Sequence, residues 1–570
     1  MVDGRRWNGW GEASIDEPLK PEALAFLAAA IGPGTPQLDA PLAGVLARIA
    51  AQPSRLPRHP RVDASPQARL RASFGQSAHD WLRLRFGVPG RVTDGVAFPE
   101  SAGEVRELLD WARRHGVQVL PCGGATSVAG HLTPAGDKPI LTLNLTRLMR
   151  LVSLDPVSQL ATFEAGVAGP QLEAQLRAHG YTLGHFPQSF DYSTLGGWIV
   201  TRSSGQQSAR YGRIEQLFAG GRVQTPEGEL VIPTYPASAA GPDLREAVLG
   251  SEGRIGVVTE ATVRVTRLPA REAFVGVFFP DWAAATAAVR ALAQARLGLS
   301  MLRLSNPVET LTTLTMAGHP GAIGWLERGL KLRGIGDGKV LLMAGFTGGA
   351  AQVSAMRRQA AHLWRQYGGV STGTLLGAKW AARRFAGVYL RNSLWDAGYA
   401  VDTMETACDW PRVDAMVAGM EAAGREALAR HGEKTHCYTH LSHVYAQGSS
   451  VYSTFVYRIG PDYPAALARW RSLKQAVGDA IAAHGGTITH QHGVGKDHAR
   501  WLPREKGPLG MAALHNLARP FDPHGVMAVG NLLGDGVAVD RDEPGDEHGD
   551  GGDALGASVK ATLSDLGRAA

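Results

Sequence analysis

Three glycine-rich blocks carry the residue types that could bind a phosphate-containing ligand. They read GGATSVAG at residues 123–130, DYSTLGGWIVTRSSGQQSARYG at 191–212 and LGSEGRIGVVTEATVRV at 249–265. Glycine lets backbone N–H groups approach a phosphate closely, and hydroxyl side chains such as Thr126 and Ser193 stand beside the glycines. Three such blocks in one region predict a long ligand that the backbone holds at several points. A dinucleotide is the simplest choice.

The spacing of the glycines argues against two common nucleotide motifs. GGATSVAG does not match the G-x-G-x-x-G pattern, and no G-K-[ST] sequence follows a glycine-rich loop. A nicotinamide or ATP site of the standard kind is therefore disfavoured. Each block taken alone could equally be a tight turn, whereas the three together favour a binding role.

Histidines at short spacing form a second group of reactive residues. His440 and His443 stand at an i, i+3 spacing that suits metal ligation, but no acidic ligand lies near them in the sequence, so no metal site is predicted. His490 and His492 flank Gln491, which cannot titrate. Without further context, this second pair reads as polar residues of a turn before a helix.

Helices and strands must position these blocks. Ser101 precedes Glu104 at capping-box spacing, and apolar residues then recur on one face, which predicts a helix that ends at Gly116. An apolar strand at 117–120 runs into the first glycine block, and another follows at 140–145. The pattern predicts a domain of alternating strands and helices that ends near residue 268.

The rest of the chain predicts a second α/β domain. Apolar β-like segments at 274–279, 340–346 and 451–457 alternate with Ala-rich helices such as 282–294. The sequence thus divides into a helical lead-in at 1–90, a ligand-binding domain at 91–268, a substrate domain at 269–480, a C-terminal helical segment at 481–535 and a tail at 536–570. The tail is acidic and Gly-rich, so we expect it to be disordered, with a weak helix near 557–566.

The composition predicts a globular protein with more than one domain. Its 570 residues exceed what one core usually supports, and 44% hydrophobic and 19% charged residues are a normal balance. The net charge of +6 comes mainly from dispersed arginines, which suits a small acidic substrate better than nucleic acid. Three widely spaced cysteines suit a reducing compartment, and no segment reads as a signal peptide. We expect a cytoplasmic protein; a peripheral membrane contact and a homodimer stay open.

The glycine blocks are familiar in combination. GGATS, PQSFDYSTLGGWIVTRSSG and GSEGRIGVVTEATVRV resemble the FAD-binding domain of the vanillyl-alcohol-oxidase and para-cresol-methylhydroxylase (PCMH) group, over Arg91 to Leu268. The resemblance implies an α+β fold with a two-part PCMH-type FAD-binding domain and a cap domain built on an antiparallel sheet. It also implies FAD. Neither Cys122 nor His131 lies in a recognisable linkage motif, so we expect FAD to be non-covalent.

The resemblance assigns cofactor contacts residue by residue, with the pyrophosphate on the first turn and the flavin and ribityl chain on the later blocks. These contacts fall on Pro121, Cys122, Gly123, Gly124, Ala125, Thr126 and Ser127; on Gln188, Ser189, Phe190, Asp191, Tyr192, Ser193 and Thr194; on Thr201, Arg202, Ser203 and Ser204; and on Glu252, Gly253, Arg254, Ile255, Gly256, Val257 and Val258.

Three further motifs narrow the resemblance. RWNGWG at residues 6–11, GGTITHQHGVGK at 485–496 and VGNLL at 529–533 resemble alkylglycerone-phosphate synthases, also called alkyldihydroxyacetonephosphate synthases. These enzymes exchange the acyl group of an acylglycerone phosphate for a long-chain alcohol, with FAD as a redox-neutral participant. The resemblance implies an acid/base group, an anion clamp and an apolar tunnel.

The same resemblance assigns the catalytic residues. Tyr452 matches the family's catalytic tyrosine, and a phenol can pass a proton to or from an alcohol if neighbours lower its pKa. Arg391 matches the arginine that binds the substrate phosphate, and Arg303 matches another arginine needed for activity. His490 and His492 match the outer two of three consecutive histidines in the family. Gln491 replaces the middle one and puts the detailed chemistry in question.

Two other functions compete with this hypothesis. One is an FAD-dependent oxidase or dehydrogenase of a 2-hydroxy acid such as D-lactate or glycolate. Many of those enzymes carry metal-binding histidines and a Glu-His-Gly motif, where this chain has Gln491, His492 and Gly493. The other is a flavin-binding scaffold protein with degraded chemistry, which the glutamine motivates and the retained tyrosine, arginine and histidines oppose.

Overall fold

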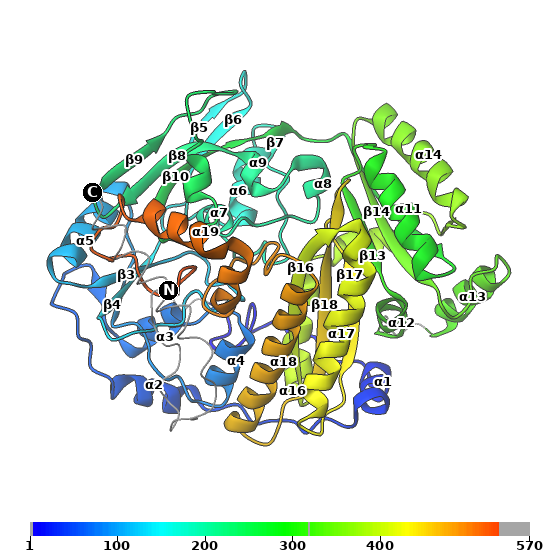
Figure 1. Cartoon of the computed structure of the whole chain (residues 1–570), viewed down its shortest axis with the longest axis horizontal. Coiled ribbons are helices and arrows are strands. Elements are labelled where there is room, and N and C mark those ends of the chain that lie inside the picture. The colour runs from blue at the N-terminus through cyan, green and yellow to red at the C-terminus, as the bar shows by residue number, and fades with distance from the viewer. Residues whose placement is uncertain (1–3, 317–319, 535–570) are drawn as a thin grey trace.

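The computed structural model describes residues 4–316 and 320–534 (Figure 1). The predicted tail at 536–570, with its weak helix, lies outside the described residues. The sheets of the N-terminal half lie on one side of Figure 1, and a larger sheet with its helices lies on the other. The structure is therefore α+β, as the sequence predicts.

The first sheet carries the first glycine block. Its strands, in the order β1-β2-β4-β3, are β1 (Val62–Asp63), β2 (Gly95–Ala97), β4 (Ile140–Asn144) and β3 (Gln118–Cys122). The predicted helix is α5 (Ala102–Arg114), where Ser101 Oγ accepts the Glu104 N–H at 3.2 Å and Gly116 follows the helix at φ 64°. β3 and β4 run parallel, so the chain between them crosses back and leaves the glycine block at the carboxyl end of β3.

A second, antiparallel sheet carries the third glycine block. Its order is β5-β6-β10-β8-β9, with β5 (Leu151–Asp155), β6 (Leu160–Glu164), β10 (Val257–Arg264), β8 (Phe218–Thr225) and β9 (Gly228–Ile232). The short pair β7 (Tyr181–Thr182) and β11 (Thr266–Arg267) lies beside it, with helices α6 (Gly169–Arg177), α7 (Leu195–Val200), α8 (Ser208–Tyr211), α9 (Ile214–Leu217) and α10 (Arg245–Val248). The middle glycine block forms α7 and its flanking turns.

The substrate domain is built on an antiparallel sheet of seven strands. In order they are β15 (Val370–Ser371), β12 (Arg271–Phe279), β14 (Val340–Gly348), β13 (Met301–Ser305), β17 (His436–Leu441), β18 (Gly448–Arg458) and β16 (Tyr399–Asp409). One face packs against α11 (Trp282–Gln294), α14 (Ala350–Gln366), α17 (Val413–Ala429) and α18 (Tyr463–Ala483), which form one hydrophobic core with it (Figure 1). The remaining helices of this region are α12 (Pro307–Met316), α13 (Pro320–Lys331), α15 (Leu375–Ala382) and α16 (Leu390–Asp396), with 3-10 turns η1 (Ala386–Tyr389) and η2 (Trp410–Arg412).

The alternation of side chains along these strands decides which residues face the ligand. Val451 and Phe455 on β18 point into the helix-covered core, so Tyr452 and Thr454 point to the opposite face. The same alternation applies to the neighbouring strands. It turns Met301 and Arg303 of β13, Tyr438 and His440 of β17, and Val401 and Thr403 of β16 toward a common cavity.

The two terminal regions join parts that are distant in sequence. In the lead-in, α1 (Pro21–Ile31) packs on residues of α16, β16 and β18, whereas α2 (Leu42–Ala50), α3 (Pro66–Ser73) and α4 (Ala78–Arg85) lie nearer the first sheet or α18. After η3 (Ala499–Trp501) and α19 (Leu502–Ala518), the chain returns to the first sheet, where the Val119 N–H donates to Val526 O at 2.7 Å. Both terminal regions thus pack on more than one part of the structure.

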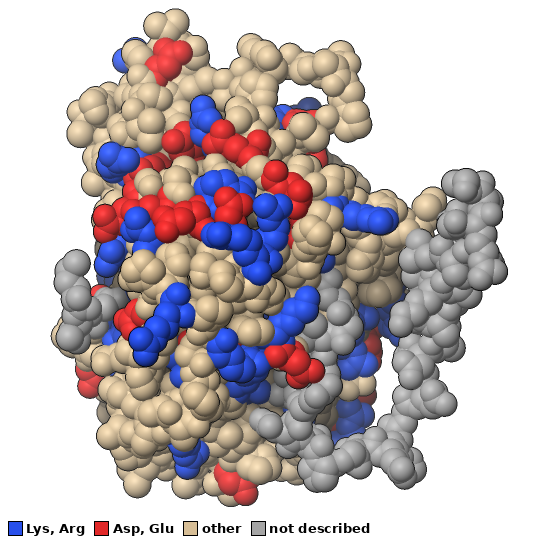
Figure 2. Space-filling model, turned by 90° about the vertical axis from the view of Figure 1, so that its left-hand side faces the viewer, with Lys and Arg blue, Asp and Glu red and all other residues tan. Residues whose placement is uncertain are grey.

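One face of the molecule shows how the dispersed charge is arranged. Figure 2 shows basic and acidic side chains side by side on the face that carries α5 and β9. Several arginines here pair with carboxylates, for example Arg113 with Glu227 at 3.2 Å and Arg222 with Glu229 at 2.8 Å. This face therefore carries mixed charge.

Within residues 4–316 and 320–534, none of the helices has the length and apolar character needed to cross a membrane.

Candidate active site

A cavity of about 880 Å³ lies where the glycine blocks meet the open face of the seven-stranded sheet. Four of the five residues predicted for catalysis or substrate binding lie on its wall, namely Arg303, Arg391, Tyr452 and His492. The predicted cofactor contacts on the wall are Pro121, Cys122, Gly123, Gly124, Ala125, Thr126, Ser127, Gln188, Ser189, Ser193, Thr194, Thr201, Ser203, Ser204 and Glu252. Segments from the whole chain thus converge on one site.

The first glycine block packs directly on the second. A Cβ at Gly123 would lie 2.2 Å from Thr194 Oγ1, and one at Gly124 would lie 1.8 Å from Tyr192 O, so neither position has room for a side chain. Beyond them, the backbone N–H groups of residues 126–128 find no acceptor among the residues that the structure describes. Such free N–H groups beside a cavity fit an anionic group such as a pyrophosphate.

Each glycine block also holds one non-glycine residue in the left-handed backbone region. These residues are Ala125 (φ 58°), Arg202 (φ 52°) and Glu252 (φ 53°). Non-glycine residues reach this region at a cost and do so most often where a site needs a particular backbone shape. The strain therefore marks all three blocks as parts of one ligand-shaped wall.

Glu252 anchors the loop that carries the histidines. Its carboxylate accepts the N–H groups of Val494 and Gly495, the latter at 2.8 Å, and its Oε2 lies 3.0 Å from Nε2 of His131. His131 in turn lies 2.5 Å, through Nδ1, from Ser127 Oγ in the first glycine block. Glu252, predicted as a cofactor contact, thus also ties two glycine blocks to the loop.

The other predicted cofactor residues lie away from the wall. Phe190 stacks on Phe385 at 4.9 Å between ring centres, and the Tyr192 hydroxyl donates to Glu12 at 3.0 Å. The side chains of Arg202 and Arg254 pair with carboxylates outside the cavity. Also outside the wall are Asp191, Gly253, Ile255, Gly256, Val257 and Val258.

Tyr452 lies at the centre of the open sheet face. Its hydroxyl donates to Thr403 Oγ1 at 3.0 Å, and its ring stacks on His440 at 4.7 Å and meets His492 edge-on at 6.1 Å. Burial raises the pKa of the phenol to about 12. The condition of a lowered pKa is therefore not met, because desolvation outweighs the neighbouring groups. The phenol of Tyr452 is protonated at neutral pH.

Arg303 has a carboxylate partner that sequence reasoning missed. Its Nη2 donates to Oε1 of Glu309 at 2.7 Å, and Nδ1 of His440 lies 3.0 Å from the same oxygen. Although burial opposes ionisation of Glu309, the Arg303 charge and His440 hold the pKa of this carboxyl at about 2. The positive charge of Arg303 is therefore offset by the Glu309 carboxylate, and this ion pair lies beside the stacked rings of His440 and Tyr452.

Arg391 places a half-buried cation on the wall. Its guanidinium lies 4.2 Å above the Trp81 ring, and Nη1 donates to Gln76 O at 2.5 Å. Burial lowers the pKa to about 10, against the opposing charge of Asp402, so Arg391 remains charged at neutral pH. A guanidinium held by a ring and a carbonyl in this way is preorganised for an anion.

The two predicted histidines have different surroundings. His492 lines the cavity together with Gln491, whereas His490 does not. The Arg213 Nη1 and the Tyr445 hydroxyl each lie 2.7 Å from Nε2 of His490. Burial lowers the pKa of His490 well below its ordinary value, and nearby His443 and Arg213 lower it further. Arg213, 277 residues away in sequence, had no signal that could have found it.

His440 and His443 are not arranged as a metal pair. Nδ1 of His440 lies 3.0 Å from the Glu309 carboxylate, and Nδ1 of His443 lies 3.5 Å from Ser204 Oγ. Burial and the Arg213 charge lower the pKa of His443 to about 3. Among the described residues there is no group of three or more His, Cys, Asp or Glu residues placed to hold a metal ion.

Comparison with known proteins agrees with this geometry. Residues 93–232 match the family model "FAD binding domain", and residues 268–532 match "FAD linked oxidases, C-terminal domain". The chain is 30% identical to the alkyldihydroxyacetonephosphate synthase of Trypanosoma brucei brucei, over 83% of this chain and 78% of that protein. The chain belongs to the alkyldihydroxyacetonephosphate synthase family.

Solved structures show the same fold. A structure of an alkyldihydroxyacetonephosphate synthase superposes with a TM-score of 0.76 at 24% identity, over 92% of this chain and 99% of that one. A structure of p-cresol methylhydroxylase with bound substrate superposes with a TM-score of 0.65 at 13% identity, over 86% and 96%. The PCMH-type fold predicted from the glycine blocks is thereby confirmed.

Membership in this family makes the protein an FAD-dependent enzyme, and the residues present fit the cofactor. The free N–H groups of the first glycine block suit the pyrophosphate, and the cavity extends from them to Tyr452. Cys122 is buried, and burial raises the pKa of its thiol to about 12. A thiol in this state is a poor nucleophile, which supports non-covalent binding of FAD.

Proposed function

We propose that the protein exchanges the acyl group of an acylglycerone phosphate for a long-chain alcohol, with FAD bound non-covalently. One observation carries this proposal: a single cavity combines the glycine cradle, the half-buried cation Arg391, the Tyr452–His492 pair and an apolar wall. The glycine cradle suits a flavin cofactor, and Arg391 suits a phosphate. The Tyr452–His492 pair suits proton transfer, and the apolar wall suits an alkyl chain.

The glycine blocks would hold the cofactor. Backbone groups of residues 121–127 would take the pyrophosphate, and Ser193, Thr194, Thr201, Ser203 and Ser204 would line the ribityl chain and the ring. Bound FAD supplies an electron-poor ring system that can accept electron density from a substrate carbon. The protein's own contribution is to place the substrate against that ring and to exclude water.

The substrate would be held at its two chemically different ends. Arg391 would bind the phosphate by charge-assisted hydrogen bonds. The alkyl chain would lie along apolar residues on the substrate-domain side of the same cavity, which include Met301, Met316, Trp380, Leu390, Leu394 and Val401. A pocket for a short hydroxy acid would need no such apolar wall.

The proton transfers fall to Tyr452 and His492. The carbon that bears the ester lies next to the ketone of glycerone, so a base can remove one of its protons. His492 faces the cavity and would take this proton, while the protonated phenol of Tyr452 would donate to the departing carboxylate or steady the incoming alcohol. Arg303, held by Glu309, would keep His440 in place beneath the phenol ring.

The contacts oppose the two competing functions. A hydroxy-acid dehydrogenase with a histidine metal site would need a carboxylate where Gln491 stands, and His440 is committed to Glu309. A scaffold with degraded chemistry would have no need to keep Arg391, Tyr452 and His492 on one wall. Gln491 itself lies at the wall with Oε1 buried and without a hydrogen-bond partner among the described residues.

The decisive experiment compares substrates without oxygen. Purified protein is mixed with palmitoyl-glycerone phosphate and hexadecanol, and in parallel with D-lactate, while the visible spectrum is followed. We expect alkylglycerone phosphate to form with no lasting loss of the flavin absorbance. Persistent bleaching by D-lactate that ends only when an acceptor is added would overturn the proposal in favour of the dehydrogenase.

The substrate class, the location and the assembly of the protein stay predictions. A small-molecule lipid phosphate as substrate follows from the proposed reaction. A location in the cytoplasm, a peripheral membrane contact and a homodimer are predictions that a fractionation experiment and a measurement of mass in solution would check.

A further inference from the structure

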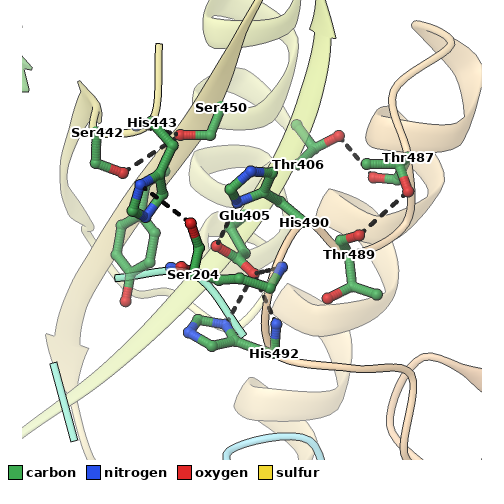
Figure 3. Close-up of polar contacts among 12 residues, drawn as sticks. Ser204, Glu405, Thr406, Ser442, His443, Ser450, Thr487, Thr489, His490 and His492 are labelled. Atoms are coloured by element: carbon green, nitrogen blue, oxygen red, sulfur yellow. Dashed lines mark hydrogen bonds and ion pairs between the residues drawn. The ribbon is translucent and has the colours of Figure 1, made fainter. Parts of the chain in front are cut away.

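Glu405 lies behind the histidine loop and had no predicted role. It belongs to β16, directly opposite Tyr452 on β18, and its side chain is 2% exposed. One oxygen, Oε1, accepts the N–H groups of Gln491 at 2.8 Å and His492 at 3.1 Å and also lies 3.2 Å from Nδ1 of His492 (Figure 3). The carboxylate therefore fixes the loop backbone at Gln491 and His492 and lies beside the imidazole ring of His492.

This contact selects one tautomer of His492. A neutral imidazole carries one N–H and one lone pair, and a carboxylate can only accept. The nearby carboxylate therefore favours the hydrogen on Nδ1 of His492, which leaves the lone pair on Nε2. The side chain of His492 is 24% exposed and lines the cavity, where a substrate can reach it.

The neighbouring His490 also has Nδ1 on the side of Glu405, 3.9 Å from Oε2, but its Nε2 is occupied inside the protein. Arginine has no lone pair to accept a hydrogen bond, so the Arg213 guanidinium at 2.7 Å must donate to Nε2 of His490. A second Arg213 nitrogen donates to the His490 carbonyl at 2.9 Å. The lone pair of His490 is thus consumed inside the protein, and of the two histidines only His492 offers one to the cavity.

We propose that Glu405 is the positioning residue that makes His492 the base of this site. Resting on the proposed function, the step is a proton transfer from the ester-bearing carbon to Nε2 of His492. The C–H bond breaks, the N–H bond forms, and the electron pair moves into the adjacent ketone as an enolate. The imidazolium so formed lies against the Glu405 carboxylate, which offsets its charge.

Two substitutions of Glu405 separate its charge from its hydrogen bonds. Glu405→Gln keeps an oxygen for the loop N–H groups but removes the negative charge, and Glu405→Leu removes the acceptor as well. The matched control is Glu173→Gln. Glu173 is also a buried carboxylate that accepts two backbone N–H groups, from Leu183 and Gly184, but it lies outside the cavity wall.

The first readout is exchange of the substrate's carbon-bound hydrogen with D2O when no alcohol is present. We expect Glu405→Gln to slow this exchange on the order of 10²-fold, with the KM for acylglycerone phosphate within about threefold of wild type and FAD fully bound. Glu173→Gln should exchange at the wild-type rate. Exchange by Glu405→Gln at the wild-type rate would overturn the proposal.

The second readout needs no substrate and so stands apart from the proposed function. The 15N spectrum of histidine-labelled holoprotein distinguishes protonated from unprotonated ring nitrogens, and the His492→Gln variant identifies the His492 signals. We expect the proton on Nδ1 in the wild type and a mixture of tautomers in Glu405→Leu. A proton on Nε2 in the wild type would refute the assignment. Correct 15N signals without any exchange on acylglycerone phosphate would instead reject the proposed substrate alone.

Discussion

The Tyr452→Phe substitution removes one hydroxyl group from the cavity wall and leaves the aromatic ring in place. The stacking on His440 at 4.7 Å survives, and the hydrogen bond to Thr403 Oγ1 is lost. Losing one buried hydrogen bond costs about 1 kcal/mol of folding free energy. Losing a general acid or base costs roughly 10²- to 10⁴-fold in rate, or about 3–5 kcal/mol of activation free energy. Turnover should therefore fall far more than stability.

Three measurements on the same sample test this prediction: alkyl-product formation, FAD content from the visible spectrum, and the midpoint of thermal unfolding. The matched control is Tyr399→Phe on β16. The Tyr399 hydroxyl donates to Gly32 O and accepts the Gly34 N–H, both at 2.9 Å, and it lies outside the cavity. Tyr399→Phe removes two hydrogen bonds, so it should lose at least as much stability and keep its kcat. If Tyr452→Phe kept more than about a tenth of the wild-type kcat with FAD bound, the role of its phenol would be refuted.

The pH dependence of the wild type follows from the same residue. Burial raises the pKa of the Tyr452 phenol to about 12, which favours the protonated form. A step that needs this proton therefore persists as the pH rises and is lost only as the pH approaches 12. We expect no loss of kcat from tyrosine ionisation below about pH 10, the ordinary tyrosine pKa.

The remaining predictions concern the cofactor, the phosphate and the acid stability. Gly124→Ala places a Cβ about where it would meet Tyr192 O at 1.8 Å, so FAD affinity should fall at least roughly tenfold by fluorescence titration; unchanged affinity would contradict the packing argument. Arg391→Met should raise the KM for the phosphate substrate roughly 10- to 100-fold while kcat falls less, and an unchanged KM would exclude Arg391 as the clamp. The pKa of Glu309, about 2 against an ordinary 4.5, adds about 3 kcal/mol of stability that is present above pH 4.5 and lost as the pH falls toward 2. In Glu309→Gln, the thermal midpoint should fall less than in the wild type as the pH drops from 4.5 toward 2. Parallel curves of thermal midpoint against pH for the two proteins would contradict the ion pair.

Local signals in the sequence account for much of the fold. The helix predicted at 282–294 is α11 with the same bounds, and Asp281 caps it by accepting the Ala284 N–H at 2.8 Å. The predicted strand at 340–346 is the buried start of β14. Caps, apolar periods and glycine turns act over a few residues, so a single sequence contains all the information that they need. The domain boundaries stay predictions, because the terminal regions pack on more than one part.

The sequence by itself determined the glycine blocks and the alternation along the strands, and through family resemblance it predicted Tyr452, Arg391 and His492 as site residues. Only the tertiary structure decided which partners control them. Glu405 lies 87 residues from His492, and Arg213 lies 277 residues from His490. A lone glutamate or arginine carries no local pattern that names its partner. Such pairs form only when strand register and the packing of the two domains bring distant segments within hydrogen-bond distance.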